Sequence, residues 1–117
     1  MTTLAEWKLT SEDGKVDCSL PYTMVFLGRT DCDINMESDS VDKRHALITF
    51  DHYQNRFKVK DLGTSSGTYI NERRIPDETF ITIEEGDAIQ LGRDILSISC
   101  LILIDHIVFL VPFRVPF

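Results

Sequence analysis

The sequence has few cysteines and no recognisable export signal. Its three cysteines are an odd number and include no CxxC pair, which argues against a disulfide framework and against a zinc site. The first residues, MTTLAE, contain neither the basic segment nor the apolar segment of a secretory signal peptide. Free thiols without an export signal predict a cytoplasmic protein.

Positive charge is also scarce. The chain has 12 lysines and arginines against 19 aspartates and glutamates, a formal net charge of -7 over 117 residues. Nucleic-acid binding rewards clustered cations, because the phosphate backbone is anionic. The basic pairs Lys43-Arg44 and Arg73-Arg74 are more typical of the rim of an anion site or of a solvated face. We therefore expect no nucleic-acid partner.

Known catalytic motifs are absent as well. The sequence has no GxSxG, P-loop, HExxH or GxGxxG pattern. Ser40, Asp42 and His45 are residue types of a catalytic triad, but three positions on one short segment do not build its geometry. The remaining histidines and cysteines do not have metal-ligand spacing. We expect no enzyme activity, no catalytic residues, no metal and no cofactor.

Helical periodicity is missing throughout, and short apolar runs alternate with turn signals. Ten such runs predict strands and, at spacings of roughly 8–12 residues, an all-β sandwich or barrel. The predicted strands cover residues 6–9, 15–18, 23–27, 33–36, 46–50, 56–60, 68–70, 80–83, 88–91 and 95–99.

Apolar residues are unevenly distributed. Of 50 hydrophobic residues, 16 lie in residues 95–117, which contain only two charged residues, Asp105 and Arg114. We therefore divide the chain into a domain at 1–99 and an apolar tail of unknown role at 100–117. A membrane span needs about 20 apolar residues; residues 95–113 come close, but Asp105 near their centre opposes insertion. An extra strand packed on the domain, or an unusual chain end, are the alternatives to an anchor.

Four spaced motifs carry a family resemblance. They are Gly28-Arg29, His45-Ala46, DLGTSSGTYIN at 61–71 and GDAIQLG at 86–92, and as a set they resemble the forkhead-associated (FHA) domain. The resemblance implies a β-sandwich of about 10–11 mostly antiparallel strands whose loops at one end bind phosphothreonine peptides. Residues 40–46 and 74–77 are also similar to the N-terminal FHA domain of the centrosomal protein of 170 kDa family, which implies a cytoskeletal or centrosomal location at microtubules.

The resemblance also assigns roles to individual residues. Arg29 would be the main phosphate anchor, since a guanidinium is planar and always charged. Lys43 and Ser65 would assist, although Lys43 is otherwise a solvated loop lysine and Ser65 a turn serine that bonds its own backbone. His45 would mainly bridge loops. The other residues assigned to loop structure are Gly28, Gly67, Thr68 and Asn71.

Two positions depart from the family pattern. Asp42 stands three residues before His45, where the family has a phosphate-binding serine, and Ser66 replaces an asparagine that grips the peptide backbone. At about 4 Å from a phosphate charge, a carboxylate costs about 1 kcal/mol in water and about 4 kcal/mol at an effective dielectric of 20. Asp42 could instead pair with a neighbouring cation, or the loop could present Ser40.

These observations predict a non-catalytic module that docks a phosphothreonine-containing or acidic partner segment, with altered or weakened phosphate recognition at Arg29, Lys43, Ser65, Ser66 and Asp42. A phospho-independent protein-binding scaffold is the main competitor. A membrane adaptor anchored through residues 101–117 is the other.

Overall fold

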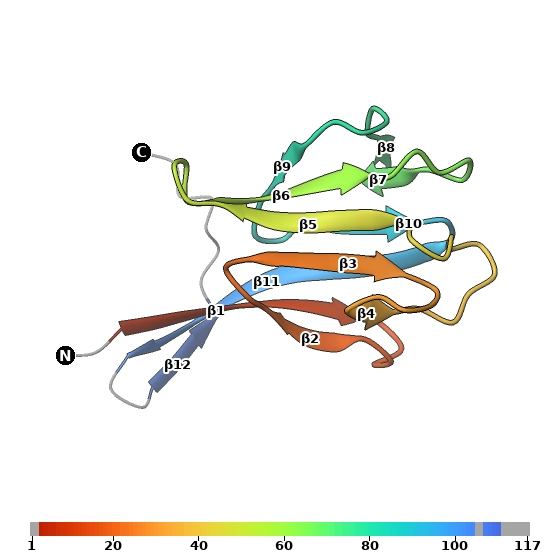
Figure 1. Cartoon of the computed structure of the whole chain (residues 1–117). Coiled ribbons are helices and arrows are strands. Elements are labelled where there is room, and N and C mark those ends of the chain that lie inside the picture. Colours follow the sequence, from red (N-terminus) through yellow and green to blue (C-terminus); the bar gives the residue numbers. More distant parts are fainter. Residues whose placement is uncertain (1–2, 105–106, 111–117) are drawn as a thin grey trace.

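The computed structural model describes residues 3–104 and 107–110, and all regular structure there is β (Figure 1). Two sheets form the layers of a sandwich. The first runs in the order β2 (Asp17–Leu20), β1 (Thr3–Ser11), β11 (Asp94–Ile104), β10 (Ala88–Leu91), β7 (Thr68–Ile70) and β8 (Arg73–Arg74), with β12 (Ile107–Leu110) added to β11. The second runs β4 (Ile34–Asn35), β3 (Met24–Gly28), β5 (Ala46–Asp51), β6 (Arg56–Asp61) and β9 (Ile81–Ile83).

The predicted all-β sandwich is confirmed. Every pairing between strands is antiparallel except that of β3 with β4. Between the predicted strands at 68–70 and 80–83, the structure has one further strand, β8, which pairs with β7. Asn71 and Glu72 both have positive φ, 49° and 70°, as in a two-residue type I′ hairpin turn. The hairpin was not predicted, because this turn has glutamate where the usual signal has glycine.

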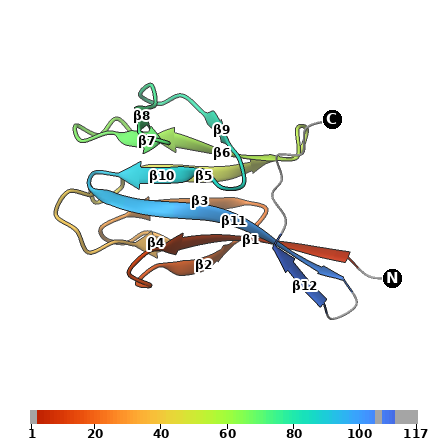
Figure 2. The same ribbon diagram turned by 180° about the vertical axis from the view of Figure 1, so that it is seen from behind.

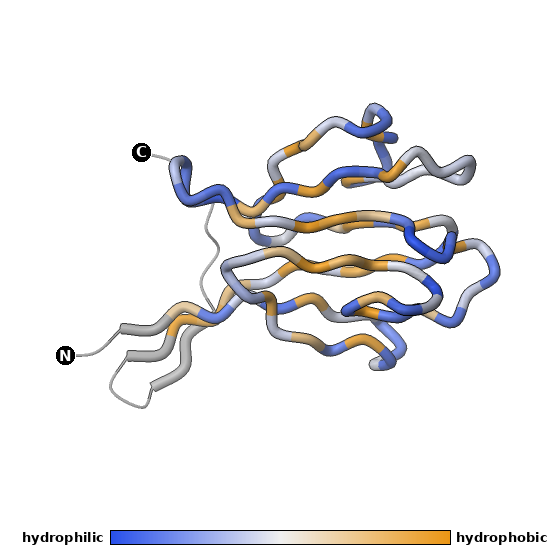
Figure 3. Tube along the Cα trace, viewed as in Figure 1, coloured by the Kyte–Doolittle hydropathy of each residue, from blue (hydrophilic) through white to orange (hydrophobic). Residues whose placement is uncertain are grey.

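The core lies between the two sheets and follows the period of two of a half-buried strand. In β6, Phe57 and Val59 are buried and alternate with more exposed basic residues. Phe57 also packs against Phe50, with ring centroids 4.9 Å apart, and against Trp7 at 5.4 Å. Figure 3 shows the same pattern, with hydrophobic segments along the strands and hydrophilic loops at the ends.

The last strands extend past the sandwich body. β11 continues through the predicted boundary at 99–100 without a break, pairs with β1 to Ile104, and carries β12 beside it (Figures 1 and 2). The division into a domain and a tail stays a prediction. Asp105, His106 and residues 111–117 lie outside the described residues. Within the described part of the chain, no helix is both long and apolar enough to span a membrane.

Three connections between strands gather at the other end of the sandwich, and one of them, residues 62–67, joins the two sheets. β3, β6 and β10 end there, and β5 and β7 begin there, so residues 29–45, 62–67 and 92–93 lie close together (Figure 1). The directions of these strands therefore bring the three connections to one surface, away from the β11–β12 extension.

Candidate functional site

Gly28 brings the first loop against the second. A Cβ atom built on Gly28 would lie only 2.1 Å from the Lys43 carbonyl oxygen, so a larger residue could not occupy this position without moving the backbone. The next residue, Arg29, donates its backbone N–H to the carbonyls of Asp42 at 2.9 Å and Lys43 at 3.1 Å. Arg29 is thereby held beside the Asp42–Lys43 segment.

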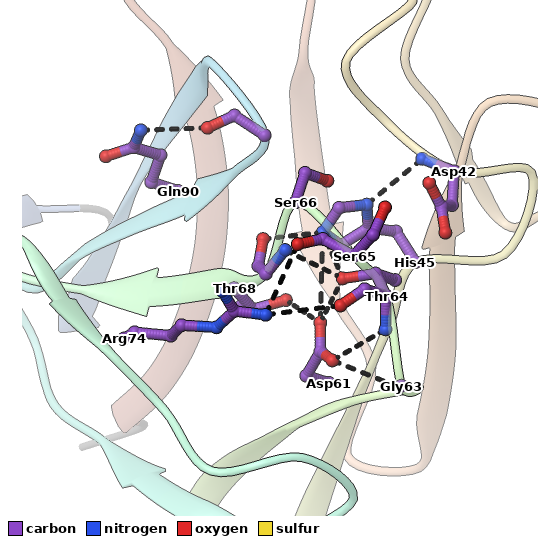
Figure 4. Close-up of polar contacts among 12 residues, drawn as sticks. Asp42, His45, Asp61, Gly63, Thr64, Ser65, Ser66, Thr68, Arg74 and Gln90 are labelled. Atoms are coloured by element: carbon purple, nitrogen blue, oxygen red, sulfur yellow. Dashed lines mark hydrogen bonds and ion pairs between the residues drawn. The ribbon is translucent and has the colours of Figure 1, made fainter.

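His45 joins this segment to the loop before β7. The imidazole is fully buried. Its Nδ1 accepts a hydrogen bond from the Asp42 N–H at 3.1 Å, and its Nε2 lies 2.9 Å from the Gly67 carbonyl oxygen (Figure 4). An acceptor at Nδ1 and a donor at Nε2 are the two sites of one neutral imidazole tautomer. His45 therefore bridges the Asp42 backbone and the Gly67 backbone.

Asp61 fixes the loop at 62–67 from below. It occupies the inward position after Phe57 and Val59 on β6 and is fully buried. Its carboxylate accepts hydrogen bonds from the hydroxyls of Thr64 and Thr68, both at 2.7 Å, and from the N–H groups of Gly63 at 3.0 Å and Thr64 at 2.9 Å. Burial alone would raise the pKa of this carboxyl, but these hydrogen bonds outweigh burial and hold the pKa below its ordinary 3.8.

Arg74 supports the same loop from its outer side. One guanidinium nitrogen donates to the carbonyls of Thr64 at 3.3 Å and Ser65 at 3.4 Å (Figure 4). A Cβ atom on Gly67, which has a φ of +83°, would come within 2.7 Å of Arg74 Nε. The loop therefore depends on a glycine at 67 both for its backbone conformation and for the room that Arg74 occupies.

We expect Arg74→Ala to loosen this loop without unfolding the domain. The substitution removes two long hydrogen bonds at a partly exposed site, so the free energy of unfolding should fall by about 1 kcal/mol. Amide hydrogen exchange at residues 63–67 should accelerate at the same time. Arg73→Ala is the matched control, because its side chain is exposed and makes no hydrogen bond or ion pair with the described residues. Equal exchange in both variants would show that Arg74 does not support the loop.

The side chains predicted to contact phosphate lie on the loops at 29–45 and 62–67. They donate no hydrogen bond to the rest of the described protein. Arg29 is half-buried, and Lys43 and Ser65 are exposed. Within residues 3–104 and 107–110, none of their side chains forms a hydrogen bond or an ion pair, and the backbone N–H groups of Ser65 and Ser66 are likewise unused. The loop end thus offers several donors to an external anion.

Asp42 and Ser40 do not adopt the alternative arrangements considered from the sequence. The Asp42 carboxylate is exposed and pairs with no cation among the described residues. The Ser40 hydroxyl shares a hydrogen bond of 2.8 Å with Ser38 and accepts the Arg93 N–H at 2.9 Å. Ser66 donates its hydroxyl to the Ser40 carbonyl at 3.1 Å. Ser40 and Ser66 are therefore engaged in holding loops together, and Asp42 presents a free carboxylate.

The predicted residues divide into two places. His45, Gly67 and Thr68 meet in the hydrogen-bonded cluster around Asp61. Asn71 lies at the far end of β7, where its side chain bonds Asp87 Oδ1 and the Ala88 N–H, both at 2.9 Å. It fixes the β7–β8 turn and takes no part in the loops at 29–45 and 62–67.

Three residues of the cluster had no predicted role: Asp61, Thr64 and Arg74. The alternation of Phe57, Val59 and position 61 places Asp61 inward, and a buried aspartate before a glycine and a threonine is the pattern of an Asx turn. These signals could have identified Asp61 and Thr64. Arg74 had no such signal, since its contact depends on how β8 folds back. No group of three or more potential metal ligands occurs in the part of the chain that the structure describes.

Two curated proteins are similar in sequence to part of this chain. Among curated relatives, an FHA domain-containing protein, PS1, from Arabidopsis thaliana is 29% identical over 85 residues, which is 72% of this chain and 5% of that protein. The probable E3 ubiquitin-protein ligase dma1 of Schizosaccharomyces pombe is 35% identical over 77 residues, 62% of this chain and 28% of that protein. The chain thus spans only a small part of the length of these relatives.

Solved structures share the fold. A structure from an analysis of phosphothreonine-dependent FHA domain interactions has a TM-score of 0.70 at 23% identity and covers 80% of this chain and 94% of its own. Mycobacterium tuberculosis EmbR, in complex with a low-affinity phosphopeptide, has a TM-score of 0.69 at 23% identity, covering 80% of this chain and 24% of its own. At these identities the likeness shows the fold alone.

The match to a family is more direct. The family model described as the FHA domain matches residues 25–92, from the inside of β3 to the turn after β10. That range contains the loops at 29–45 and 62–67 and the Asp61 cluster, and it is more than half of the chain. The protein therefore belongs to the FHA domain family, whose members are phosphothreonine-dependent protein-interaction modules and generally not enzymes.

Proposed function

We propose that this protein is a non-catalytic module that docks a phosphothreonine-containing segment of a partner protein on its loop end, with weakened phosphate recognition. One observation carries the proposal. Arg29, Lys43 and Ser65 have no partner for their side chains among the described residues, yet their backbones lie on loops that His45 and Asp61 hold firmly.

The chemistry of the three side chains suits a phosphate. A phosphothreonine carries a charge of about -1.5 to -2 at pH 7 and three acceptor oxygens. Arg29 would supply a planar pair of donors, Lys43 a mobile ammonium, and Ser65 a hydroxyl. The unused N–H groups of Ser65 and Ser66 add donors of the kind that bind anions in backbone turns. An acidic segment without phosphate would offer one charge per side chain and would bind less tightly.

Asp42 limits how strongly this site holds a phosphate. Its carboxylate is exposed on the same segment as Lys43 and is not neutralised by a described cation. At a separation of about 4 Å, repulsion between this carboxylate and the phosphate would cost about 1 to 4 kcal/mol. That cost would offset one charge-assisted hydrogen bond, which is worth about 1.5–3 kcal/mol. Ser66 does not compensate, since its hydroxyl is bonded to the Ser40 carbonyl.

We expect Asp42→Ser to raise the affinity for phosphothreonine peptides about tenfold, because the repulsion disappears and a hydroxyl donor is gained. Isothermal titration calorimetry with a degenerate phosphothreonine library, beside the same library without phosphate, measures the effect. Asp39→Ser is the matched control, since Asp39 is exposed on the same loop. Low-micromolar binding by the wild type with no gain in Asp42→Ser would show that Asp42 does not weaken the site.

A phospho-independent contact is the competing function, and the same titration separates the two. Equal binding of the phosphorylated and unphosphorylated libraries would favour it. Where the protein resides is a separate proposal: its three free cysteines support the cytoplasm, and the likeness of residues 40–46 and 74–77 to the centrosomal protein of 170 kDa family supports centrosomes and microtubules. Fluorescence microscopy of the tagged chain against a centrosomal marker tests that location.

A further inference from the structure

An open groove lies beside the loops at 29–45 and 62–67, where we propose that phosphate binds. It is bounded by the turn between β1 and β2, the segment after β4 and the turn between β10 and β11. All three segments lie at the same end of the sandwich as the loops at 29–45 and 62–67 (Figure 1). The groove therefore opens on the surface where the proposed ligand would lie.

The groove continues directly from the phosphate site. Ser66, on the phosphate loop, donates to the carbonyl of Ser40. The Ser40 hydroxyl in turn bonds Ser38 and the backbone of Arg93, and both of these residues line the groove. Only Ser40 thus lies between the proposed phosphate site and the groove. An extended peptide bound at the phosphate site would reach the groove within a few residues, at about 3.3 Å per residue.

Carboxylates outnumber cations along the groove. Four acidic residues line it, against Lys15 and Arg93. Asp13 is occupied by hydrogen bonds from the Ser11 hydroxyl and the Lys15 N–H. The other three carboxylates make no ion pair with any residue that the structure describes; they belong to Glu12, Glu37 and Asp94.

Apolar side chains lie between these charges. Val16 and Met36 line the groove and are buried, whereas Ile95 is 53% exposed. An apolar surface beside unpaired carboxylates suits a lysine or arginine side chain, because its methylene stem can cover the apolar part while its charged head reaches a carboxylate. An anionic membrane surface or a nucleic acid would be repelled by the same carboxylates.

We propose that this groove binds lysine or arginine side chains of the partner, so that the preferred ligand is a phosphothreonine segment with basic residues near the phosphorylated position. The inference rests on the proposed function for the phosphate, but the groove's affinity for a basic segment does not depend on Arg29. The phosphate and the basic residues of the partner segment bind to two neighbouring surfaces of opposite charge.

Fluorescence anisotropy tests the groove with four labelled peptides of one length. Three carry phosphothreonine flanked on both sides by lysine, alanine or glutamate, and the fourth carries lysines without phosphate. We expect the lysine-flanked phosphopeptide to bind about five-fold more tightly than the alanine-flanked one at low salt, and the difference to shrink at about 0.5 M salt. In the double variant Glu37→Gln/Asp94→Asn the two should bind alike. The control is Glu72→Gln/Glu78→Gln, which neutralises two exposed carboxylates away from the groove.

The outcomes separate the groove from the phosphate site. Equal affinity for the three phosphopeptides, or a preference that survives Glu37→Gln/Asp94→Asn, overturns the groove and leaves the proposed function intact. If no phosphopeptide binds better than the unphosphorylated lysine peptide, yet that peptide binds and loses affinity in the groove variant, the groove stands and the proposed function fails. If none of the four peptides binds, both are wrong.

Discussion

Replacing Arg29 with alanine is expected to lower the affinity for phosphothreonine peptides by roughly a hundredfold. The guanidinium is always charged and planar, and it forms no ion pair with the described residues. Two charge-assisted hydrogen bonds to phosphate are worth about 3 kcal/mol together, and about 1.4 kcal/mol corresponds to a factor of ten. Arg29→Lys should recover only part of the loss, because an ammonium cannot bond two oxygens in one plane.

Calorimetry with the phosphothreonine peptides measures this effect. Arg73→Ala is the matched control, because it removes one arginine that lies outside the loops at 29–45 and 62–67. Circular dichroism should show the same fold in all three variants, since the Arg29 side chain makes no hydrogen bond or ion pair that the structure describes. Undiminished binding by Arg29→Ala would exclude Arg29 as the phosphate anchor.

Replacing Asp61 with asparagine is expected to lower the free energy of unfolding by about 2–4 kcal/mol at pH 7. The carboxylate accepts from four donors at once: two threonine hydroxyls and two backbone N–H groups. An asparagine amide offers one oxygen and turns an NH2 group toward the remaining donors, so at least two of the four donors lose their acceptor. Because the loop at 62–67 depends on these bonds, phosphopeptide affinity should fall as well.

The Asp61 carboxylate also makes the free energy of unfolding depend on pH. Its pKa is below 3.8 in the folded protein, since hydrogen bonds to Thr64, Thr68 and Gly63 favour the charged form despite burial. The stabilisation is therefore present above the unfolded-state pKa and is lost as the pH falls through the folded-state value. Urea denaturation should show wild-type stability declining below about pH 4, and Asp61→Asn should remove much of that decline.

Asp51→Asn is the comparison for this prediction. Asp51 also accepts several hydrogen bonds, including a 3.0 Å contact with Lys58, but it is half-buried at the edge of the fold. We expect it to cost less than about 1 kcal/mol. If Asp61→Asn is no more destabilising than Asp51→Asn, the Asp61 cluster does not hold the loops.

Strand positions could be predicted from the sequence because short apolar runs lie between turn residues and because, at 56–60, apolar residues alternate with a period of two. The runs at 46–50, 56–60 and 88–91 reappear as β5, β6 and β10 with shifts of at most one residue. The hairpin of β7 and β8 could not be predicted, since its turn uses Asn71 and Glu72 at positive φ instead of a glycine. The extent of β11 was also missed, because an apolar run without turn residues does not mark where a strand ends.

The site was only partly predictable, for a similar reason. Short motifs point to residues such as Arg29 and His45, whose neighbours in the chain already form a pattern. Contacts between loops depend on where each loop folds. The Arg74 contact with the Thr64 carbonyl and the Ser66 contact with the Ser40 carbonyl join residues 10 and 26 positions apart, and no local pattern encodes them.

An NMR titration tests the central claim most directly. Isotope-labelled protein is titrated with a phosphothreonine peptide and, separately, with the same peptide without phosphate. We predict that only the phosphorylated peptide shifts the amide signals of Arg29, Lys43, Ser65 and Ser66, with shifts that saturate at weak affinity. Shifts that are the same for both peptides, or that lie on the sheet faces and leave these four amides unmoved, would contradict phosphothreonine docking at the loop end.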